Sequence, residues 1–146
     1  MKLQTKNKIV VAFTLSIALV SLLFASGCNE KVAAEGLWEN AVYTSDKSFG
    51  EGKKSIEVEV KAGEQSITFT LNTDKKNLAD ALLEHKLVEG DSSEYGLYIK
   101  KVNGIIADYD VDKSYWSLCK DGEALMTGAS ATEISDGEHY ELVYTK

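Results

Sequence analysis

The stretch SIEVEVKAGEQSITFTLNT, residues 55–73, decides the fold class because it holds two short runs in which apolar and polar residues alternate. A period of two with one apolar face is typical of a half-buried β-strand. The connector AGEQ between the runs is short and contains Gly63, so the two strands are expected to form a hairpin. The apolar positions are Ile56, Val58 and Val60 in the first run and Ile67, Phe69 and Leu71 in the second.

The next stretch, NLADALLEHKLVEG at residues 77–90, predicts a helix. Asn77 is a suitable N-cap, and Asp80 follows three residues later, as in a capping box. Apolar residues at positions 78, 81, 82 and 87 form a stripe over about three turns, and Gly90 is expected to end the helix.

Three further strands are predicted at 97–102, 115–120 and 139–144, with turns at Asp121-Gly122 and Asp136-Gly137. A hairpin, one helix and then more strands is an α+β order. We therefore expect a β-grasp-like domain over residues 54–146, with a mostly antiparallel sheet and one helix packed on one face. Residues 28–53 have no sustained period and are predicted to be a tether that lifts the domain off the membrane. Trp38 and Tyr43 are unusual in a linker and leave a short first strand as the alternative.

The N-terminus has the pattern of a secretory signal over residues 1–27. Three lysines precede an uncharged run from Ile9 to Gly27. The box ASGC at its end resembles the bacterial lipoprotein signal, which implies cleavage after Gly27 and a diacylglycerol on Cys28. The lipid would anchor the protein to the outer face of the bacterial cytoplasmic membrane. A plain transmembrane anchor remains the alternative, since about 20 apolar residues can span a bilayer.

The charge of the chain argues against nucleic acid as a partner. The formal net charge is −7, and removal of residues 1–27 would take away three lysines and no acidic residue, which makes it −10. Every basic residue is lysine, and phosphate-backbone binding requires clustered positive charge. With Cys28 acylated, Cys119 would be the one remaining thiol, and a lone cysteine in a strand is usually a small core residue.

The sequence predicts neither an enzyme nor a metal site. His85 and His139 have no cysteine or histidine at metal-ligand spacing, and no Cys-His signature surrounds Cys119. The acidic run at 108–112 has oxygen ligands at alternate positions, as calcium prefers. It departs from the EF-hand pattern at Lys113 and Cys119, so a solvated acidic turn is the favoured interpretation.

Five aromatic residues fall between positions 95 and 116. Alternation places Tyr98 opposite Leu97, and Tyr115 opposite Trp116, so at least two of the five should face outward. Exposed aromatic side chains can form a binding surface for a planar ligand or for a partner protein.

From about Lys54 to the C-terminus the chain resembles the C-terminal domain of transcobalamin and intrinsic factor, and the bacterial transcobalamin-like lipoproteins built on that domain. The resemblance rests on Tyr95-Gly96, Val102-Asn103-Gly104, Tyr115-Trp116, Thr127-Gly128-Ala129 and Asp136-Gly137-Glu138. It implies a β-grasp-like fold and a surface that covers one side of cobalamin.

The resemblance also implies ligand-binding residues. The family's Trp-Gln-Leu segment matches Trp116, Ser117 and Leu118, in which Ser117 is shorter than the glutamine. Its Leu-Leu-Gln-Gly loop matches residues 125–128, with Met126, Thr127 and Gly128 as candidates. Tyr95 and Tyr98 are expected to join this site. The large helical domain of the carriers has no counterpart in the chain.

Two functions are therefore expected. The first is capture of a ligand, a corrinoid such as cobalamin, for a membrane transporter or for a separate helical partner protein. The alternative is a non-catalytic surface module that binds another protein through the same aromatic residues, because a resemblance of fold does not transfer function.

Overall fold

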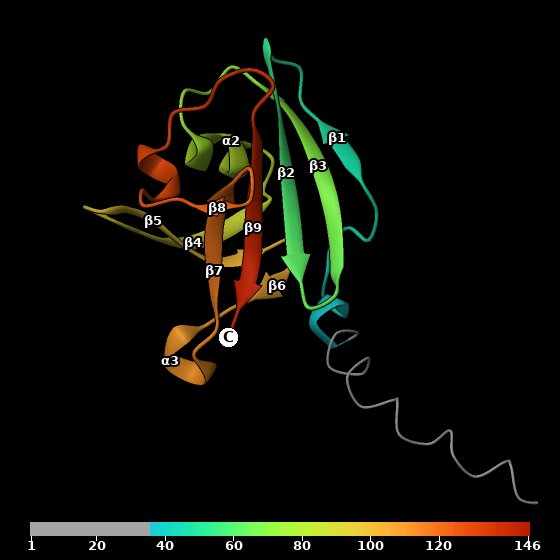
Figure 1. Cartoon of the computed structure of the whole chain (residues 1–146), viewed down its shortest axis with the longest axis vertical. Coiled ribbons are helices and arrows are strands. Elements are labelled where there is room, and N and C mark those ends of the chain that lie inside the picture. Colours follow the sequence, from blue (N-terminus) through green and yellow to red (C-terminus); the bar gives the residue numbers. More distant parts are fainter. Residues whose placement is uncertain (1–35) are drawn as a thin grey trace, which may run out of the picture. The chain divides into compact units, whose positions relative to one another are not determined.

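A computed structural model describes residues 36–146 of the chain (Figure 1). The predicted signal peptide, 1–27, and Cys28 with its predicted lipid lie outside the described residues. Among residues 36–146, no helix has the length and apolar character needed to cross a membrane. The elements in chain order are β1 (Lys47–Phe49), β2 (Lys54–Ala62), β3 (Gln65–Thr73), α2 (Leu78–Glu84), β4 (Val88–Ser93), β5 (Gly96–Val102), β6 (Ile105–Ile106), α3 (Tyr109–Asp112), β7 (Tyr115–Lys120), β8 (Glu123–Ala124), the 3₁₀ helix η1 (Ala129–Ala131) and β9 (His139–Thr145).

The strands form a six-stranded sheet in the order β1-β3-β2-β9-β7-β8 and a three-stranded sheet in the order β4-β5-β6. β2 and β3 pair antiparallel, which confirms the predicted hairpin, and Ala62 faces Gln65 across its two-residue turn. Gly63 in that turn has a φ of 63°, a conformation that glycine adopts without steric cost. On its other side β2 pairs in parallel with β9, so the last strand of the chain lies at the centre of the sheet.

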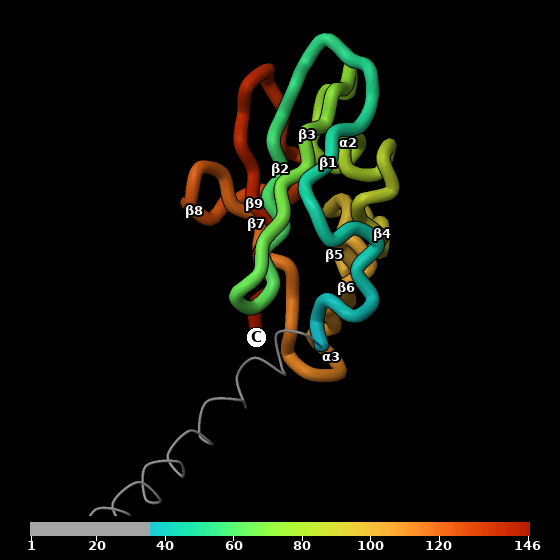
Figure 2. Tube along the Cα trace, turned by 90° about the vertical axis from the view of Figure 1, so that its right-hand side faces the viewer, coloured from blue at the N-terminus to red at the C-terminus, as the bar shows by residue number. Residues whose placement is uncertain are grey.

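The hydrophobic core lies on one face of the six-stranded sheet. Figure 2 shows α2 and the three-stranded sheet together on that side, while the other face of the six-stranded sheet is left open. The predicted apolar positions of the hairpin are all buried, and Tyr140 and Leu142 of β9 continue the same core. α2 contributes Leu78, Ala81 and Leu82, which are fully buried. The domain is therefore β-rich, with a second layer over one face of its main sheet.

The predicted helix forms but ends earlier than expected. Asn77 caps it by accepting a hydrogen bond from the Asp80 N–H at 2.8 Å. The last helical residue is Glu84, not a residue next to Gly90. The N–H groups of Lys86 and Leu87 return to the carbonyls of Leu83 and Leu82, both at 3.0 Å, which is a Schellman ending.

Residues 36–53 require a correction to the predicted tether. Trp38 is 8% exposed, and its indole Nε1 donates a hydrogen bond to the Ala62 carbonyl at 2.9 Å. β1 pairs in parallel with β3 at the edge of the sheet. Tyr43 packs on Phe49 with ring centroids 5.3 Å apart. The domain thus begins by Trp38, because these aromatic side chains cover core that β2 and β3 alone would expose to water.

The three later strands are confirmed as β5, β7 and β9. Asp121 and Gly122 both have positive φ values, as in the tight turn that joins β7 to β8. Cys119 is half-buried rather than a core residue. Trp116 and Leu118 occupy the core face of β7, so alternation places Cys119 on the open face, opposite Glu141 of β9.

Candidate functional site

Trp116 is a buried residue of β7 at the edge of the hydrophobic core. Its indole is 8% exposed and meets the Tyr144 ring edge-on, with centroids 5.6 Å apart. Its Nε1 is buried, and within residues 36–146 it has no hydrogen-bond partner. A buried N–H without an acceptor is uncommon and is unfavourable for the free domain.

Leu118 and Ser117 point to opposite faces of β7. Leu118 is half-buried against the core, as is Leu125, whose N–H donates to the Leu118 carbonyl at 2.9 Å. Ser117 lies on the open face, where its Oγ is 3.9 Å from the Cys119 Sγ. The structure therefore brings Leu118 together with Trp116 but separates Ser117 from both. The prediction that Ser117 contacts the same ligand as Trp116 and Leu118 is wrong, because neighbouring side chains of a strand point to opposite faces.

The loop at residues 125–130 displays Met126, which is 97% exposed, together with Thr127 and Gly128. Its conformation is held from within. The Gly128 carbonyl accepts hydrogen bonds from the Ala131 N–H and from the Thr132 hydroxyl, each at 3.0 Å. The buried Ala129 anchors the loop in the core. An exposed methionine on a fixed loop is a ready apolar contact for a ligand.

A second loop lies beside the first. The turn between β4 and β5 carries Tyr95, which is 90% exposed. The Ser130 Oγ accepts a hydrogen bond from the Leu97 N–H at 3.0 Å, which ties this turn to η1. At Gly96, with a φ of 104°, a Cβ atom would stand 2.8 Å from the Ser130 Cβ, so glycine permits the close approach. Ser130 was not predicted from the sequence. The Tyr95-Gly96 pair was the one local signal for the contact between these two loops.

We name the candidate site as the surface formed by Tyr95, Leu97, Leu118, Leu125 and Met126. We call three leucines the apolar floor, because each is partly buried and packs against the hydrophobic core: Leu97, Leu118 and Leu125. Tyr95 and Met126 rise from the two loops at its margin. Trp116 packs into the core beside this floor.

Tyr98 is not part of this surface. Leu97 and Ile99 of β5 pack against the core, while Tyr98 points away and is 49% exposed, opposite Asp91 of β4. The prediction that Tyr98 and Tyr115 face outward is confirmed, since Tyr115 is 39% exposed. The prediction that Tyr98 shares a site with Trp116 is wrong, for the same reason of alternation.

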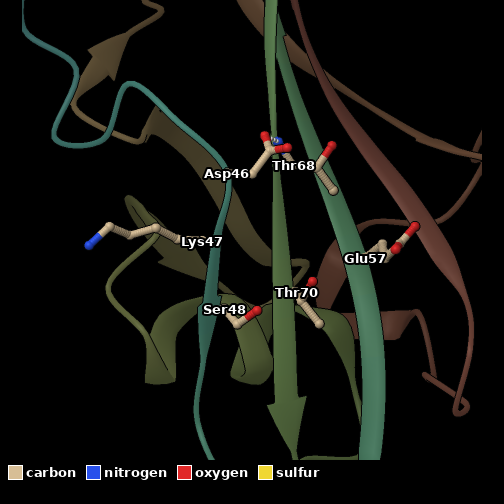
Figure 3. A pocket seen from close by; sticks show the side chains of 6 residues that line it. All are labelled: Asp46, Lys47, Ser48, Glu57, Thr68 and Thr70. Atoms are coloured by element: carbon tan, nitrogen blue, oxygen red, sulfur yellow. Dashed lines mark hydrogen bonds between the residues drawn. The ribbon is translucent and has the colours of Figure 1, made fainter.

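Two hollows of the domain lie away from the candidate site. One of about 280 Å³ is on the open face, lined by two carboxylates, one lysine and three hydroxyl groups (Figure 3). In it, the Asp46 carboxylate accepts the Thr68 N–H at 2.8 Å. Another hollow, of about 380 Å³, lies around Glu84 and His85. No predicted ligand-binding residue lines either of them.

The acidic run at 108–112 uses its carboxylates locally. Asp108 caps α3 by accepting the Asp110 N–H at 3.0 Å. The Ser114 hydroxyl, the Lys146 ammonium and the Ser114 N–H all donate to Asp112, and they lower the pKa of Asp112 to about 2. Within residues 36–146, no group of three or more histidine, cysteine, aspartate or glutamate residues is placed to hold a metal ion.

A charged network covers the open face beside Cys119. Lys61 Nζ donates to Glu141 at 2.8 Å and lies 3.1 Å from Glu59. The hydrogen bond from Lys61 holds the pKa of Glu141 below its ordinary value although burial acts the other way. His139 lies between the same two carboxylates, at 3.7 and 3.9 Å. These groups pair with one another and stabilise the contact between β2 and β9.

Comparison with known proteins identifies the family. The model of the domain of unknown function DUF4430 matches residues 76–146. A solved structure from Ruminococcus gnavus ATCC 29149, which carries a provisional description as a metal binding protein, is 37% identical with a TM-score of 0.61. That match covers 64% of this chain and 98% of the other.

Haptocorrin in complex with Cbi is 20% identical with a TM-score of 0.53, which shows a likeness of fold. The match covers 67% of this chain but 26% of haptocorrin, so the chain corresponds to about a quarter of that protein. No curated protein matches the sequence. The chain thus contains a DUF4430 domain at residues 76–146, and because it is 37% identical to the R. gnavus protein over nearly all of that protein, the two belong to one family.

Proposed function

We propose that this protein is a lipid-anchored, non-catalytic binding protein on the outer face of the cytoplasmic membrane, and that its β-grasp-like domain holds a ligand on the candidate site. One observation carries the proposal. Tyr95 and Met126, which are 90% and 97% exposed, are held next to an apolar floor by two loops that Ser130 joins. Exposed apolar patches on a protein surface often mark a site that binds a ligand or a partner protein.

A flat, partly apolar molecule suits this surface better than a small polar one. Tyr95 and Met126 are almost fully exposed, so a broad ligand can gain contact area on them where a small one would gain little. The likeness of fold to haptocorrin, solved in complex with Cbi, supports a corrinoid as the ligand.

A one-sided surface should bind weakly by itself. The chain corresponds to about a quarter of haptocorrin, and each 1.4 kcal/mol of lost contact weakens binding about tenfold. We therefore propose that a second protein, a transporter or a helical partner, covers the exposed side of the ligand. An anchored capture protein would raise the local concentration of ligand at that partner.

The anchor itself is proposed from the ASGC box and the apolar run before it. Cys28→Ala should abolish lipid attachment and shift the protein from the membrane fraction to unprocessed or released forms. Unchanged processing and unchanged detergent partitioning of this variant would refute the anchor.

Calorimetric titration of residues 29–146 with cobalamin tests the ligand. Saturable heat is expected at or below about millimolar ligand, which corresponds to roughly 4 kcal/mol. Tyr95→Ala and Met126→Ala should weaken binding with little change in stability, since both side chains are exposed. Tyr98→Ala is the matched control, because it removes an exposed tyrosine of the same hairpin from the opposite face.

No heat with the unaltered domain at millimolar cobalamin would reject a corrinoid as the ligand. Equal losses for Tyr95→Ala and Tyr98→Ala would reject the candidate site. In either case the exposed tyrosines would be better explained by a protein-interaction module, whose partner could meet several faces of the domain.

A further inference from the structure

A second group of exposed apolar side chains lies at one end of the domain, outside the candidate site. Val42, Ile106 and Val111 are 65%, 63% and 81% exposed. The first described residues, β6 and α3 come together at this end in both views (Figures 1 and 2). The Val42 N–H donates to the Asn103 carbonyl at 3.0 Å, which fixes Val42 beside the turn into β6. We call these three residues the apolar end.

The charges near the apolar end are mixed, with three aspartates and one lysine in residues 108–113. Asp112 pairs with Lys146 at 2.9 Å, and Lys113 lies over the Tyr109 ring at 4.7 Å from its centroid. Asp108 is engaged in capping α3. Strong electrostatic attraction to an anionic surface is therefore not expected, and contact must depend on the apolar side chains and on proximity.

Proximity follows from the length of the chain before the domain. Trp38 is fixed to the sheet through its hydrogen bond to Ala62, so the domain begins there. Whatever its conformation, the segment from Cys28 to Trp38 spans no more than about 36 Å. A domain of this size has a radius of gyration of about 13 Å, which for a sphere means a diameter of about 34 Å, so this reach is about one domain diameter. A lipid on Cys28 would keep the start of the domain within that distance of the bilayer.

We propose that the apolar end rests on the phospholipid surface of the membrane that holds the anchor. This inference depends on the proposed lipidation of Cys28. Val42, Ile106 and Val111 insert at the boundary between headgroups and acyl chains, where exposed aliphatic side chains gain apolar contact. Three side chains would bind too weakly to hold a free domain on the membrane, but the anchor raises their effective concentration at the surface.

Docking would fix the orientation of the domain as well as its height. η1, which borders the candidate site, lies away from α3 and β6 (Figure 1). The connection between β1 and β2, which carries the exposed Glu51, lies at the opposite end of the sheet in both views. The candidate site would then face the space above the bilayer, open to a ligand and to a partner.

The test uses the full, processed protein reconstituted in vesicles of phosphatidylethanolamine and phosphatidylglycerol. In a Cys119→Ser background, Val111→Cys and Ile106→Cys receive an environment-sensitive fluorophore, and Glu51→Cys is the matched control. All three positions are exposed, so labelling should leave the fold intact. Docking predicts blue-shifted emission and quenching by lipids spin-labelled near the headgroup at positions 111 and 106, but not at position 51.

Emission and quenching at positions 111 and 106 equal to those at position 51, in protein that sediments with the vesicles, would overturn the docking. Fractionation before labelling reports on the anchor separately. Protein found in the soluble fraction of the cells would refute the anchor and the docking with it. The two failures are therefore distinguishable.

Discussion

The two tryptophans of the domain allow a matched test of their hydrogen bonding. In the structure of residues 36–146 the indole N–H of Trp38 has an acceptor, and that of Trp116 has none. Trp38 and Trp116 are each 8% exposed. Trp38 Nε1 donates to the Ala62 carbonyl at 2.9 Å, whereas Trp116 Nε1 has no partner among the described residues. Replacement of each by phenylalanine removes the same atoms, so the two substitutions differ mainly in the hydrogen bond.

The expected difference can be worked from that bond. The loss of apolar contact and the space left behind should be similar at the two sites and largely cancel in the comparison. Trp38→Phe also breaks a buried hydrogen bond, worth about 0.5–1.5 kcal/mol, and leaves the Ala62 carbonyl without this donor. Trp116→Phe instead removes a donor whose burial is itself unfavourable. Trp38→Phe should therefore destabilise the domain by about 1–2 kcal/mol more than Trp116→Phe.

Urea unfolding of residues 29–146, followed by far-ultraviolet circular dichroism, measures both costs without relying on tryptophan fluorescence. The m-values of the two variants should agree with that of the unaltered domain, so that midpoints can be compared directly. Equal costs, or a larger cost for Trp116→Phe, would mean that Trp116 Nε1 has a partner in the free protein. The assignment of Trp116 Nε1 as a buried donor without a partner would then be refuted.

Three further outcomes are expected. Gly90→Ala should be strongly destabilising, because its Cβ would stand 1.9 Å from a carbonyl oxygen of β5, whereas Gly128→Ala, with nothing within 4 Å, should leave the urea midpoint nearly unchanged. The pKa of Asp112 should be about 2 by NMR titration and should rise in Ser114→Ala, so the stability from this group is present above its unfolded value near 3.9 and is lost as pH falls towards 2. Cys119, which is half-buried, should react with a thiol reagent in the native state more slowly than in denaturant, and equal rates would contradict its placement.

The parts of the fold that depend on neighbouring residues were predictable from the sequence. The hairpin of β2 and β3 has a two-residue turn, and its alternating pattern faces a single core. The end of α2 was not predictable, although it is also local. Lys86 takes the left-handed conformation, with a φ of 54°, at a position where glycine is the usual signal. Gly90 instead lies in β4, where the backbone of β5 leaves no room for a side chain.

Pairings between distant residues could not be predicted. The parallel contact of β2 with β9 joins residues about 80 positions apart, such as Val58 and Tyr140. The candidate site depends on a similar contact, because the hydrogen bond from Leu97 to Ser130 spans 33 positions. No local pattern marks a serine whose role is to receive a backbone N–H from another loop.

The errors at Ser117 and Tyr98 have a different origin. Ser117 was assigned to a site with Trp116 as part of the matched segment, and Tyr98 as a member of the aromatic cluster, yet alternation along a strand puts neighbours on opposite faces. Leu118 meets two conditions. It matches the family's Trp-Gln-Leu segment, and it lies on the same core face of β7 as Trp116. A residue carried over from a resemblance should therefore also pass the test of strand periodicity before it is placed in a site.

Trp116 belongs to the core of the free domain. A buried N–H without an acceptor costs roughly 1–3 kcal/mol. Because Nε1 is itself buried, an acceptor from outside could reach it only if the atoms that cover it moved, and the Tyr144 ring packs on the same indole with centroids 5.6 Å apart. The burial of Trp116 therefore argues against a flat aromatic platform, and the contacts of a ligand should come from the exposed side chains Tyr95 and Met126 instead.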